Sequence, residues 1–152
     1  MTLTLTSSAF APGKPIPDRY SCKGQNVSPA LDWAGAPAQT VTFALIMDDP
    51  DAPSGTYVHW VIYNIPAAGK GLAQAIAPKP TLPDGTAQGR NSSNEQFYFG
   101  PCPPSGTHRY FFKLYALDTR LELASAPNAA QLQKAMQGHI LAQGELMGTF
   151  SK

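Results

Sequence analysis

The sequence predicts a mainly β, antiparallel architecture with one or two helices near its C-terminal end. Three long runs rich in β-branched and aromatic residues are spaced along the chain, whereas helical spacing is found only after residue 128. The 13 glycines and 15 prolines suit the many turns of such a fold. At 152 residues the chain has the length of one domain, predicted over residues 1–152.

Five stretches have the composition and spacing of strands. They lie around Leu3 and Leu5, and at 31–33, 41–47, 57–65 and 109–117. Leu3 and Leu5 alternate with threonines, which is the pattern of a strand with one buried face. The 41–47 run is β-branched or apolar throughout, as expected for a central strand buried on both faces. The stretches 12–38 and 67–89 are rich in proline and glycine, which predicts mainly irregular connections.

The helical pattern begins at Asn128, a suitable N-cap for a helix over residues 129–137. Leu132 and Met136 share one face of that helix, and Gly138 is expected to end or kink it. The apolar residues that follow permit a further short helical segment, made of Ile140, Leu141 and Leu146.

The charge balance excludes partners that need a strongly basic surface. Lys and Arg total 11 and Asp and Glu total 10, so the net charge is +1. We therefore expect neither nucleic-acid binding nor a polybasic contact with a membrane. The first residues lack the features of a signal peptide, and no apolar stretch approaches the roughly 18 residues that span a bilayer. The sequence predicts a cytoplasmic protein without a stable membrane anchor.

The two cysteines, Cys22 and Cys102, each lack a neighbouring cysteine or histidine at the spacing of a zinc site. In a cytoplasmic protein, isolated thiols of this kind are expected to be free and buried. A disulfide between them is the alternative if the fold brings their two loops together.

Ionisable residues are scarce, and several gather where predicted strands begin or end. Asp49 and Asp51 follow the most hydrophobic strand, on a stretch that Pro50 and Pro53 stiffen. His59 starts the next strand eight residues after Asp51, so a hairpin return would place it beside the carboxylates. A strict two-residue period would put His59 on the face that carries every second residue after it, namely Val61 and Tyr63.

A third segment is the loop at 100–106, Gly-Pro-Cys-Pro-Pro-Ser-Gly, which is followed by His108 and Tyr110 on one face of a strand. The backbone N–H groups of Cys102 and Ser105 could form an anion-binding concavity, whereas the prolines have no N–H to donate. Each segment also has a purely structural interpretation. Asp49 and Asp51 could accept backbone hydrogen bonds in a turn, His59 could be a core histidine, and the 100–106 loop could be a rigid connection between strands. Together they suggest one small pocket.

Taken in order, these motifs resemble the phosphatidylethanolamine-binding protein family, also called Raf kinase inhibitor-like proteins. The main motifs are Asp49-Pro50-Asp51-Ala52-Pro53, His59-Trp60-Val61, and Pro103-Pro104 followed by His108-Arg109-Tyr110. Residues 20–29, 100–104 and 138–141 are similar to the short bacterial branch of that family. The matches run from about Pro17 to Phe150 and cover nearly the whole chain.

The resemblance implies a large antiparallel sheet packed on a smaller one, with a pocket for phosphate-like anions at one end of the larger sheet. The pocket positions carried over are Asp49, Asp51, Pro53, His59, Pro103, His108 and Tyr110, together with Cys102, where many eukaryotic members have glycine. Little sequence follows Met147, so the C-terminal helix that covers the eukaryotic pocket is expected to be missing. A small phosphorylated molecule or side chain then suits the pocket better than a long-chain phospholipid.

Two aspartates beside a bound anion require compensation. Like charges about 4 Å apart repel by roughly 4 kcal/mol at an effective dielectric constant of about 20. Protonated His59 and His108 are expected to supply positive charge and hydrogen-bond donors. We also expect Arg109 to neutralise one carboxylate, and at least one aspartate to orient a histidine.

The leading hypothesis is a non-catalytic binding protein for a small phosphorylated or anionic ligand, with no cofactor and no metal. It could regulate a kinase-like protein partner, and exposed sheet edges suggest a homodimer. One alternative is a small hydrolase that uses the Asp and His residues for acid–base chemistry, although no Gly-x-Ser-x-Gly elbow is present. Another is a metal site, since two histidines and two carboxylates form a common ligand set.

Overall fold

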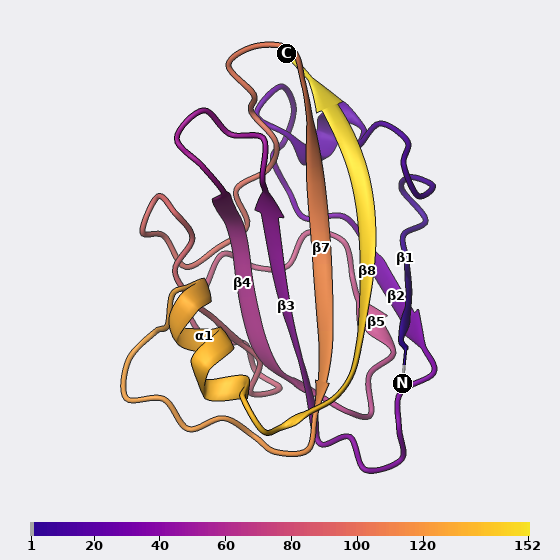
Figure 1. Ribbon diagram of the computed structural model, residues 1–152, viewed down its shortest axis with the longest axis vertical. Helices are drawn as coiled ribbons and strands as arrows, with labels where there is room; N and C mark the ends of the chain where they lie inside the picture. Colours follow the sequence, from indigo (N-terminus) through magenta and orange to yellow (C-terminus); the bar gives the residue numbers. More distant parts are fainter. Residues whose placement is uncertain (1) are drawn as a thin grey trace.

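Two antiparallel sheets packed face to face form the body of the protein, as the computed structural model shows for residues 2–152 (Figure 1). The elements are β1 (Thr4–Thr6), the 3₁₀ helix η1 (Asp18–Tyr20), β2 (Leu31–Ala34), β3 (Thr42–Asp49), β4 (Tyr57–Pro66), β5 (Gly71–Leu72), β6 (Ala87–Gln88), β7 (Thr107–Leu117), α1 (Ala129–Met136) and β8 (Ile140–Ser151). The smaller sheet has the order β1-β2-β5 and the larger one β6-β4-β3-β7-β8. The predicted mainly β class and the two-sheet arrangement are confirmed.

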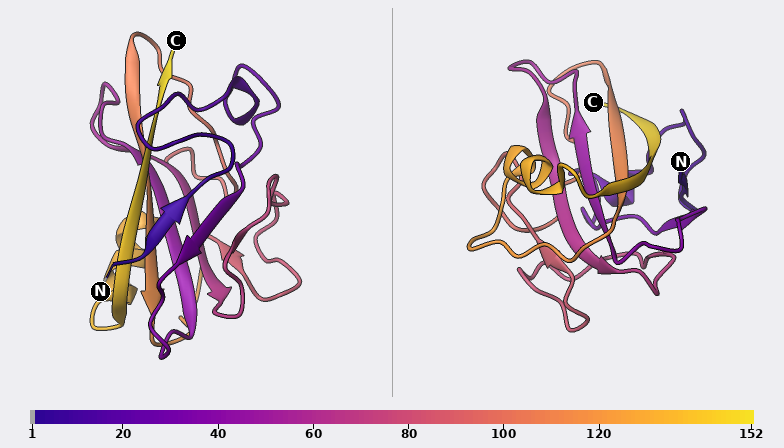
Figure 2. Two further views of the ribbon diagram at one scale, coloured as in Figure 1. Left: turned by 90° about the vertical axis from the view of Figure 1, so that its right-hand side faces the viewer. Right: turned by 60° about the horizontal axis from the view of Figure 1, so that its bottom comes forward.

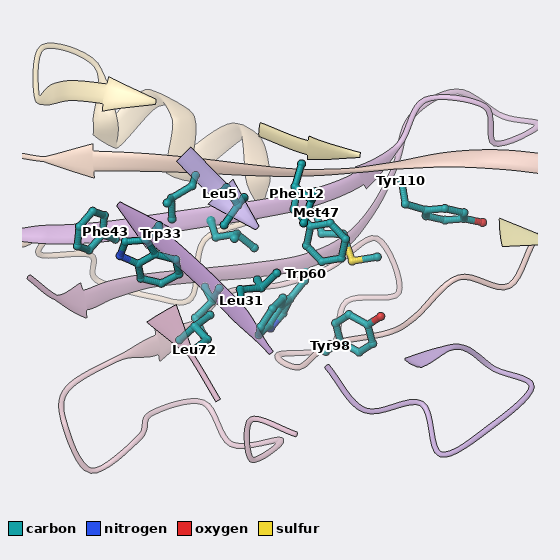
Figure 3. Close-up of a cluster of buried hydrophobic side chains, with 14 of the residues drawn as sticks. Leu5, Leu31, Trp33, Phe43, Met47, Trp60, Leu72, Tyr98, Tyr110 and Phe112 are labelled. Atoms are coloured by element: carbon teal, nitrogen blue, oxygen red, sulfur yellow. The ribbon is translucent and has the colours of Figure 1, made fainter. Parts of the chain in front are cut away.

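The main core lies between the two sheets. Phe43, Trp60 and Phe112 of the larger sheet pack in one cluster with Leu31 and Trp33 of the smaller sheet (Figure 3). Full burial of each such side chain contributes about 1.5–3 kcal/mol before the loss of conformational entropy is counted. This apolar layer therefore holds the sheets together.

The central strand β3 is buried on both faces, as its composition predicts. Phe43 and Leu45 face the smaller sheet, whereas Ala44 and Ile46 belong to a second cluster that contains Leu132 of α1. The helix therefore covers the face of the larger sheet that the smaller sheet leaves free. Because both faces of β3 are covered, the end of this strand is held in a fixed position.

Helix α1 begins as predicted. The Asn128 side chain accepts a hydrogen bond from the Gln131 backbone, and the Gln131 side chain accepts one from the Asn128 backbone, both 2.9 Å long. This reciprocal capping box satisfies N–H groups that a helix start leaves unpaired. The helix ends at Met136, and Gly138 follows with φ at 82°, in the left-handed region that favours glycine.

The prediction of a further helical segment after Gly138 is wrong, because residues 140–151 form β8. This strand pairs with β7 along its whole length, from Thr107 opposite Ser151 to Leu117 opposite Ile140. Its inward residues recur with a strand period at Leu146, Gly148 and Phe150. The stretch 67–89, predicted to be mainly irregular, also contains two short strands, β5 and β6.

The N-terminal segment covers the outer edge of β8, as the views in Figure 2 show. Leu3, Gly13 and Ile16 donate backbone hydrogen bonds of 3.0, 2.7 and 2.8 Å to Gln143, Met147 and Thr149. Several edge groups of β8 are therefore bonded within the chain. In residues 2–152, no helix is both long and apolar enough to cross a membrane.

Cys22 and Cys102 form a disulfide, so the expectation of free thiols is wrong. Their Cα atoms lie 5.4 Å apart although 80 positions separate them in the chain. The Cys22 N–H also donates to the Pro101 carbonyl at 3.1 Å, and the Gly100 N–H donates to the Asn26 side chain at 2.7 Å. The turn after η1 and the loop before β7 are thus held together by both backbone bonds and the bridge.

Candidate functional site

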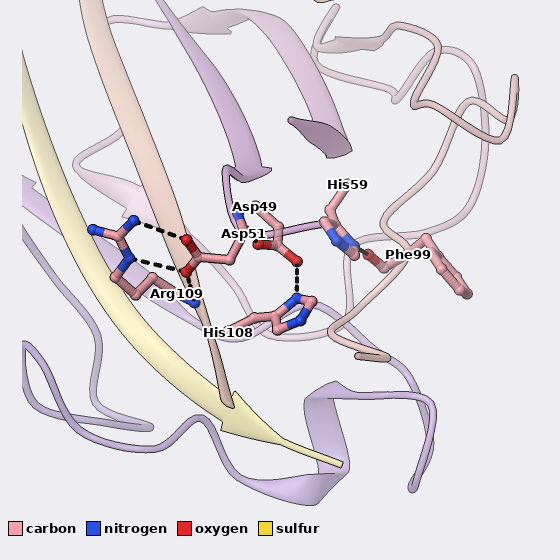
Figure 4. A network of polar contacts seen from close by, with 6 residues as sticks. All are labelled: Asp49, Asp51, His59, Phe99, His108 and Arg109. Carbon is pink, nitrogen blue, oxygen red and sulfur yellow. Dashed lines mark hydrogen bonds and ion pairs between the residues drawn. The ribbon is translucent and has the colours of Figure 1, made fainter. Parts of the chain in front are cut away.

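A pocket of about 260 Å³ opens at the end of the larger sheet, where β3 ends and β4 and β7 begin (Figure 4). Its lining residues are Asp49, Ala52, Pro53, Tyr57, His59, Phe99, Cys102, Pro103, Pro104, His108 and Tyr110. Seven of the eight residues predicted from the sequence line this pocket, and the eighth, Asp51, lies beside it without lining it. The three segments of the sequence thus converge at one site.

His59 reaches the pocket because β4 has a bulge. Met47 pairs with Trp60 and Asp48 pairs with Val58, which leaves His59 as an extra residue in β4. A bulge interrupts the two-residue alternation and turns a side chain to the other face. His59 therefore lies edge-on to Tyr110, with ring centres 5.3 Å apart, and not on the face of Val61 and Tyr63 as a strict period predicts.

Asp49 orients His108, as expected for at least one of the two aspartates. Oδ2 of Asp49 accepts a 2.6 Å hydrogen bond from Nδ1 of His108, and both residues are buried. Oδ1 of Asp49 accepts a second bond, 2.8 Å long, from the Asp51 backbone. The carboxylate therefore fixes the ring of His108 and supplies the counter-charge for its protonated form.

His59 is held by a backbone carbonyl and not by a carboxylate. Its Nδ1 donates a 2.6 Å hydrogen bond to the carbonyl of Phe99, and its ring stacks on the Phe99 ring at 5.8 Å. Burial lowers the pKa of His59 below the ordinary value of 6.5. Burial therefore favours the neutral form of the His59 ring, which weighs against the positive charge that the sequence analysis expects there.

Tyr110 lines the pocket, and its buried hydroxyl lies near the Asp49 side chain and the Cys102 backbone. Its side chain is fully buried, and its hydroxyl has no hydrogen-bond partner among the residues described. Burial, followed by the nearby charge of Asp49, raises the pKa of Tyr110, so the hydroxyl keeps its proton. An unsatisfied buried hydroxyl costs about 1–3 kcal/mol, which a ligand oxygen could recover.

Asp51 is neutralised by Arg109, as the sequence suggests. The carboxylate accepts bonds of 2.9 and 2.8 Å from the guanidinium and one of 3.0 Å from the Arg109 backbone. These bonds lower the pKa of Asp51 from 3.8 to about 2. This pair ties the β3–β4 turn to β7, so Asp51 holds the pocket wall in place without lining the pocket.

Four lining residues were not among the predicted site residues: Ala52 and Pro104, which stand in the quoted motifs, and Tyr57 and Phe99, which do not. Phe99 is the most important of these, because its carbonyl holds His59. Its place directly before the Gly100-Pro101 pair that opens the 100–106 loop is the signal that could have identified it. Tyr57 lies two positions before His59, and the two rings are 4.8 Å apart.

Two other features lie away from this pocket. An open hollow of about 580 Å³ between the 90–94 loop and the start of α1 contains none of the predicted site residues. Asp48 points to the opposite face of β3, where it pairs with Lys113 at 3.0 Å. Within residues 2–152, no group of three or more His, Cys, Asp or Glu side chains is arranged to hold a metal ion.

Fold and site together define a class of protein: a two-sheet β protein with a small preformed pocket at the end of its larger sheet. The chain belongs to the phosphatidylethanolamine-binding protein family, whose sequence pattern it matches over residues 6–151. A UPF0098 protein of Methanothermobacter thermautotrophicus is 47% identical over 99% of both chains. A Mycobacterium tuberculosis protein named as a candidate lipoprotein, LppC, is 45% identical over 97% of this chain and 72% of its own length.

Solved structures described as members of this family superpose closely on the chain. A homologue from Chlamydia trachomatis superposes with a TM-score of 0.91 at 40% identity, covering 99% of this chain and 98% of its own. YbcL of Escherichia coli, described as a new member of the mammalian family, superposes with a TM-score of 0.90 at 31% identity, covering 100% and 99%. The resemblance to this family is therefore confirmed.

Proposed function

We propose that the pocket binds the phosphate group of a small molecule or of a phosphorylated side chain, and does not convert it. The observation that carries this proposal is the buried, unpartnered hydroxyl of Tyr110. It lines the same pocket as His59 and His108, whose Nδ1 atoms are both engaged by the protein. A preformed pocket with a few converging polar groups is typical of a ligand site.

The charges support an anion at this site despite the two aspartates. Arg109 neutralises Asp51, and a protonated His108 neutralises Asp49. With those pairs formed, a bound phosphate meets hydrogen-bond donors at Tyr110 and at Nε2 of His108. His108 can donate from Nε2 only when both of its ring nitrogens carry a proton, so phosphate affinity should be higher in mild acid than in mild base.

The sharpest test of phosphate binding is Tyr110→Phe, because this change removes one unpaired hydroxyl and keeps the ring. Calorimetric titration with inorganic phosphate should show tighter binding at pH 5.5 than at pH 8, and about tenfold or greater loss in the variant. The free energy of unfolding should not fall. The matched control is Tyr98→Phe: its hydroxyl donates at 2.6 Å to the Tyr20 carbonyl, so this change should lower stability and spare affinity. Unchanged affinity in Tyr110→Phe would overturn the proposal.

Binding without turnover is supported by the pocket lining, which in residues 2–152 contains no serine, threonine or lysine. Its one cysteine, Cys102, is bonded to Cys22 and is no nucleophile. We therefore expect no release of nitrophenol from 4-nitrophenyl phosphate. Turnover that disappears in His108→Ala would instead favour the hydrolase alternative, with Asp49 and His108 as an acid–base pair.

The compartment is a second part of the proposal. A disulfide persists in oxidising surroundings and is rare in the cytoplasm, where thiols are kept reduced. The bridge between Cys22 and Cys102, together with the relative named as a candidate lipoprotein, therefore favours an oxidising compartment over the predicted cytoplasm. Alkylation of thiols in intact producing cells tests this: both cysteines should resist labelling until a reductant is added.

A further inference from the structure

We propose that this pocket selects oxyanions that carry a proton, such as phosphomonoesters, over equally charged oxyanions that carry none, such as sulfate monoesters and phosphodiesters. The inference rests on the proposed phosphate site and adds the chemical class that the site accepts. It follows from which nitrogen of each histidine the protein itself occupies.

His59 offers a ligand an acceptor and not a donor. The carbonyl of Phe99 has no proton to give, so the bond to Nδ1 of His59 requires the hydrogen to be on Nδ1. A neutral imidazole with its hydrogen on Nδ1 has a lone pair on Nε2. Since Nδ1 is turned to the protein, Nε2 is the nitrogen left to meet a ligand.

The surroundings of His59 keep the ring neutral. The Phe99 ring stacks on one side, and the rings of Tyr57 and Tyr110 lie 4.8 and 5.3 Å away. The carboxylates of Asp48 and Asp49 and the carbonyls of Phe99 and Gly100 favour a proton, but desolvation is the larger effect and lowers the pKa of His59. Among the groups that line the pocket with it, His108 adds positive charge when it is protonated, which further disfavours a second proton on His59.

Two other residues of the same pocket, Tyr110 and His108, offer donors. The Tyr110 hydroxyl has no hydrogen-bond partner among the described residues, and His108, whose Nδ1 is bonded to Asp49, has a donor at Nε2 when both ring nitrogens carry a proton. A phosphomonoester monoanion matches both the donors and the acceptor, because its unprotonated oxygens accept from Tyr110 and His108 while its P–OH donates to Nε2 of His59. A sulfate monoester has the same charge and shape, yet it presents a bare oxygen to that lone pair.

A pocket of this kind rejects the wrong anion by leaving polar groups unpaired. A site built to make one particular hydrogen bond binds an analogue that cannot make it far more weakly, because a buried polar group of the site is then left unpaired. A sulfate ester could bind well only after His59 takes up a proton, which its burial opposes. We therefore expect the phosphate ester to bind about ten- to a hundredfold more tightly than the sulfate ester.

The test compares phenyl phosphate, phenyl sulfate and methyl phenyl phosphate by calorimetry at pH 5.5. Near this pH most phenyl phosphate is a monoanion with one proton, since its second pKa is about 6, whereas the other two are monoanions without a proton. Preference for phenyl phosphate by about tenfold or more supports the inference. Equal binding of all three overturns the selectivity and leaves the anion pocket standing, whereas no binding of any overturns the proposed function as well.

A variant and a spectroscopic measurement make the test specific to His59. His59→Gln places an amide that can turn its NH₂ group to a bare oxygen, so discrimination between phenyl phosphate and phenyl sulfate should largely disappear. His139→Gln is the matched control, because His139 is only partly buried, pairs with Asp118 and does not line the pocket. In the ¹⁵N spectrum of the unaltered protein with phenyl phosphate bound, Nε2 of His59 should stay unprotonated. A protonated Nε2 in that complex overturns the inference even if the variant does not fold.

Discussion

The orientation of single side chains decides what this pocket can bind. The residue types of the site are readable in the sequence, since Asp49, His108 and Tyr110 occupy the positions that the motifs indicate. The orientation of His59 is not readable, because it depends on a bulge set by the pairing of β4 with β3. Its tautomer depends on the carbonyl of Phe99, which is 40 residues away in the chain.

Burial of neutral His59 should make the protein less stable in mild acid. Its pKa is lowered in the folded state, so below about pH 6.5 the unfolded chain binds a proton that the folded chain does not. Stability is full above that pH and falls as pH decreases toward the folded pKa, by at most about 1.4 kcal/mol per pH unit. Urea unfolding at pH 7.5 and 5.5 measures the loss. The loss should shrink in His59→Gln and persist in His139→Gln; an equal loss in both variants would contradict this origin.

The Asp51–Arg109 pair predicts a carboxyl group whose titration depends on one guanidinium. In Arg109→Met the pKa of Asp51 should rise from about 2 toward 3.8, as carboxyl ¹³C shifts would show. Because the folded pKa is lowered, the pair stabilises the protein above about pH 4, and this contribution is lost as pH falls toward 2. The control is Arg120→Met, since Arg120 lies 3.8 Å from exposed Glu122. If the pKa of Asp51 stays near 2 in Arg109→Met, the guanidinium of Arg109 is not what lowers it.

Whole elements were predicted where their own residues determine them. The composition of 41–47 and the cap at Asn128 identify β3 and α1 because burial on both faces and the capping box are local signals. The sequence after Gly138 is ambiguous, since a short apolar run fits a helix or a strand equally well. Residues 140–151 form a strand because they pair with β7, and the local sequence pattern does not identify that pairing partner.

Close approach at β8 gives a prediction for its glycine. A Cβ at Gly144 would lie 2.3 Å from the backbone carbonyl oxygen of Leu3, which is nearer than atoms can pack. Gly144→Ala should therefore displace the N-terminal segment and lower the free energy of unfolding by about 1–3 kcal/mol. In the matched control Gly69→Ala, the nearest atom would be 3.5 Å away, and stability should change little. Equal midpoints of urea unfolding for both variants would argue against this contact.

At the scale of the whole molecule, the two-sheet arrangement was foreseen through the family resemblance, and the long-range connections were not. Residues 3–16, for example, bond to the edge of β8 far along the chain. The homodimer and the kinase-like partner stay predictions. The disulfide likewise joins positions 80 apart, which composition and spacing alone could not pair.

The bridge links the stability of the fold to the shape of the pocket. Cys102 lines the pocket whereas Cys22 does not, so Cys22→Ser opens the bridge without altering a lining residue. Loss of a bridge across a long loop should lower the free energy of unfolding by about 2–4 kcal/mol. The freed 100–106 loop should also weaken phosphate binding, because the backbone of Cys102 is no longer anchored. A reductant should produce both effects in the unaltered protein and no further change in Cys22→Ser. If reduction lowers stability but leaves phosphate affinity unchanged, the backbone bonds of Gly100 and Pro101 suffice to hold the pocket wall.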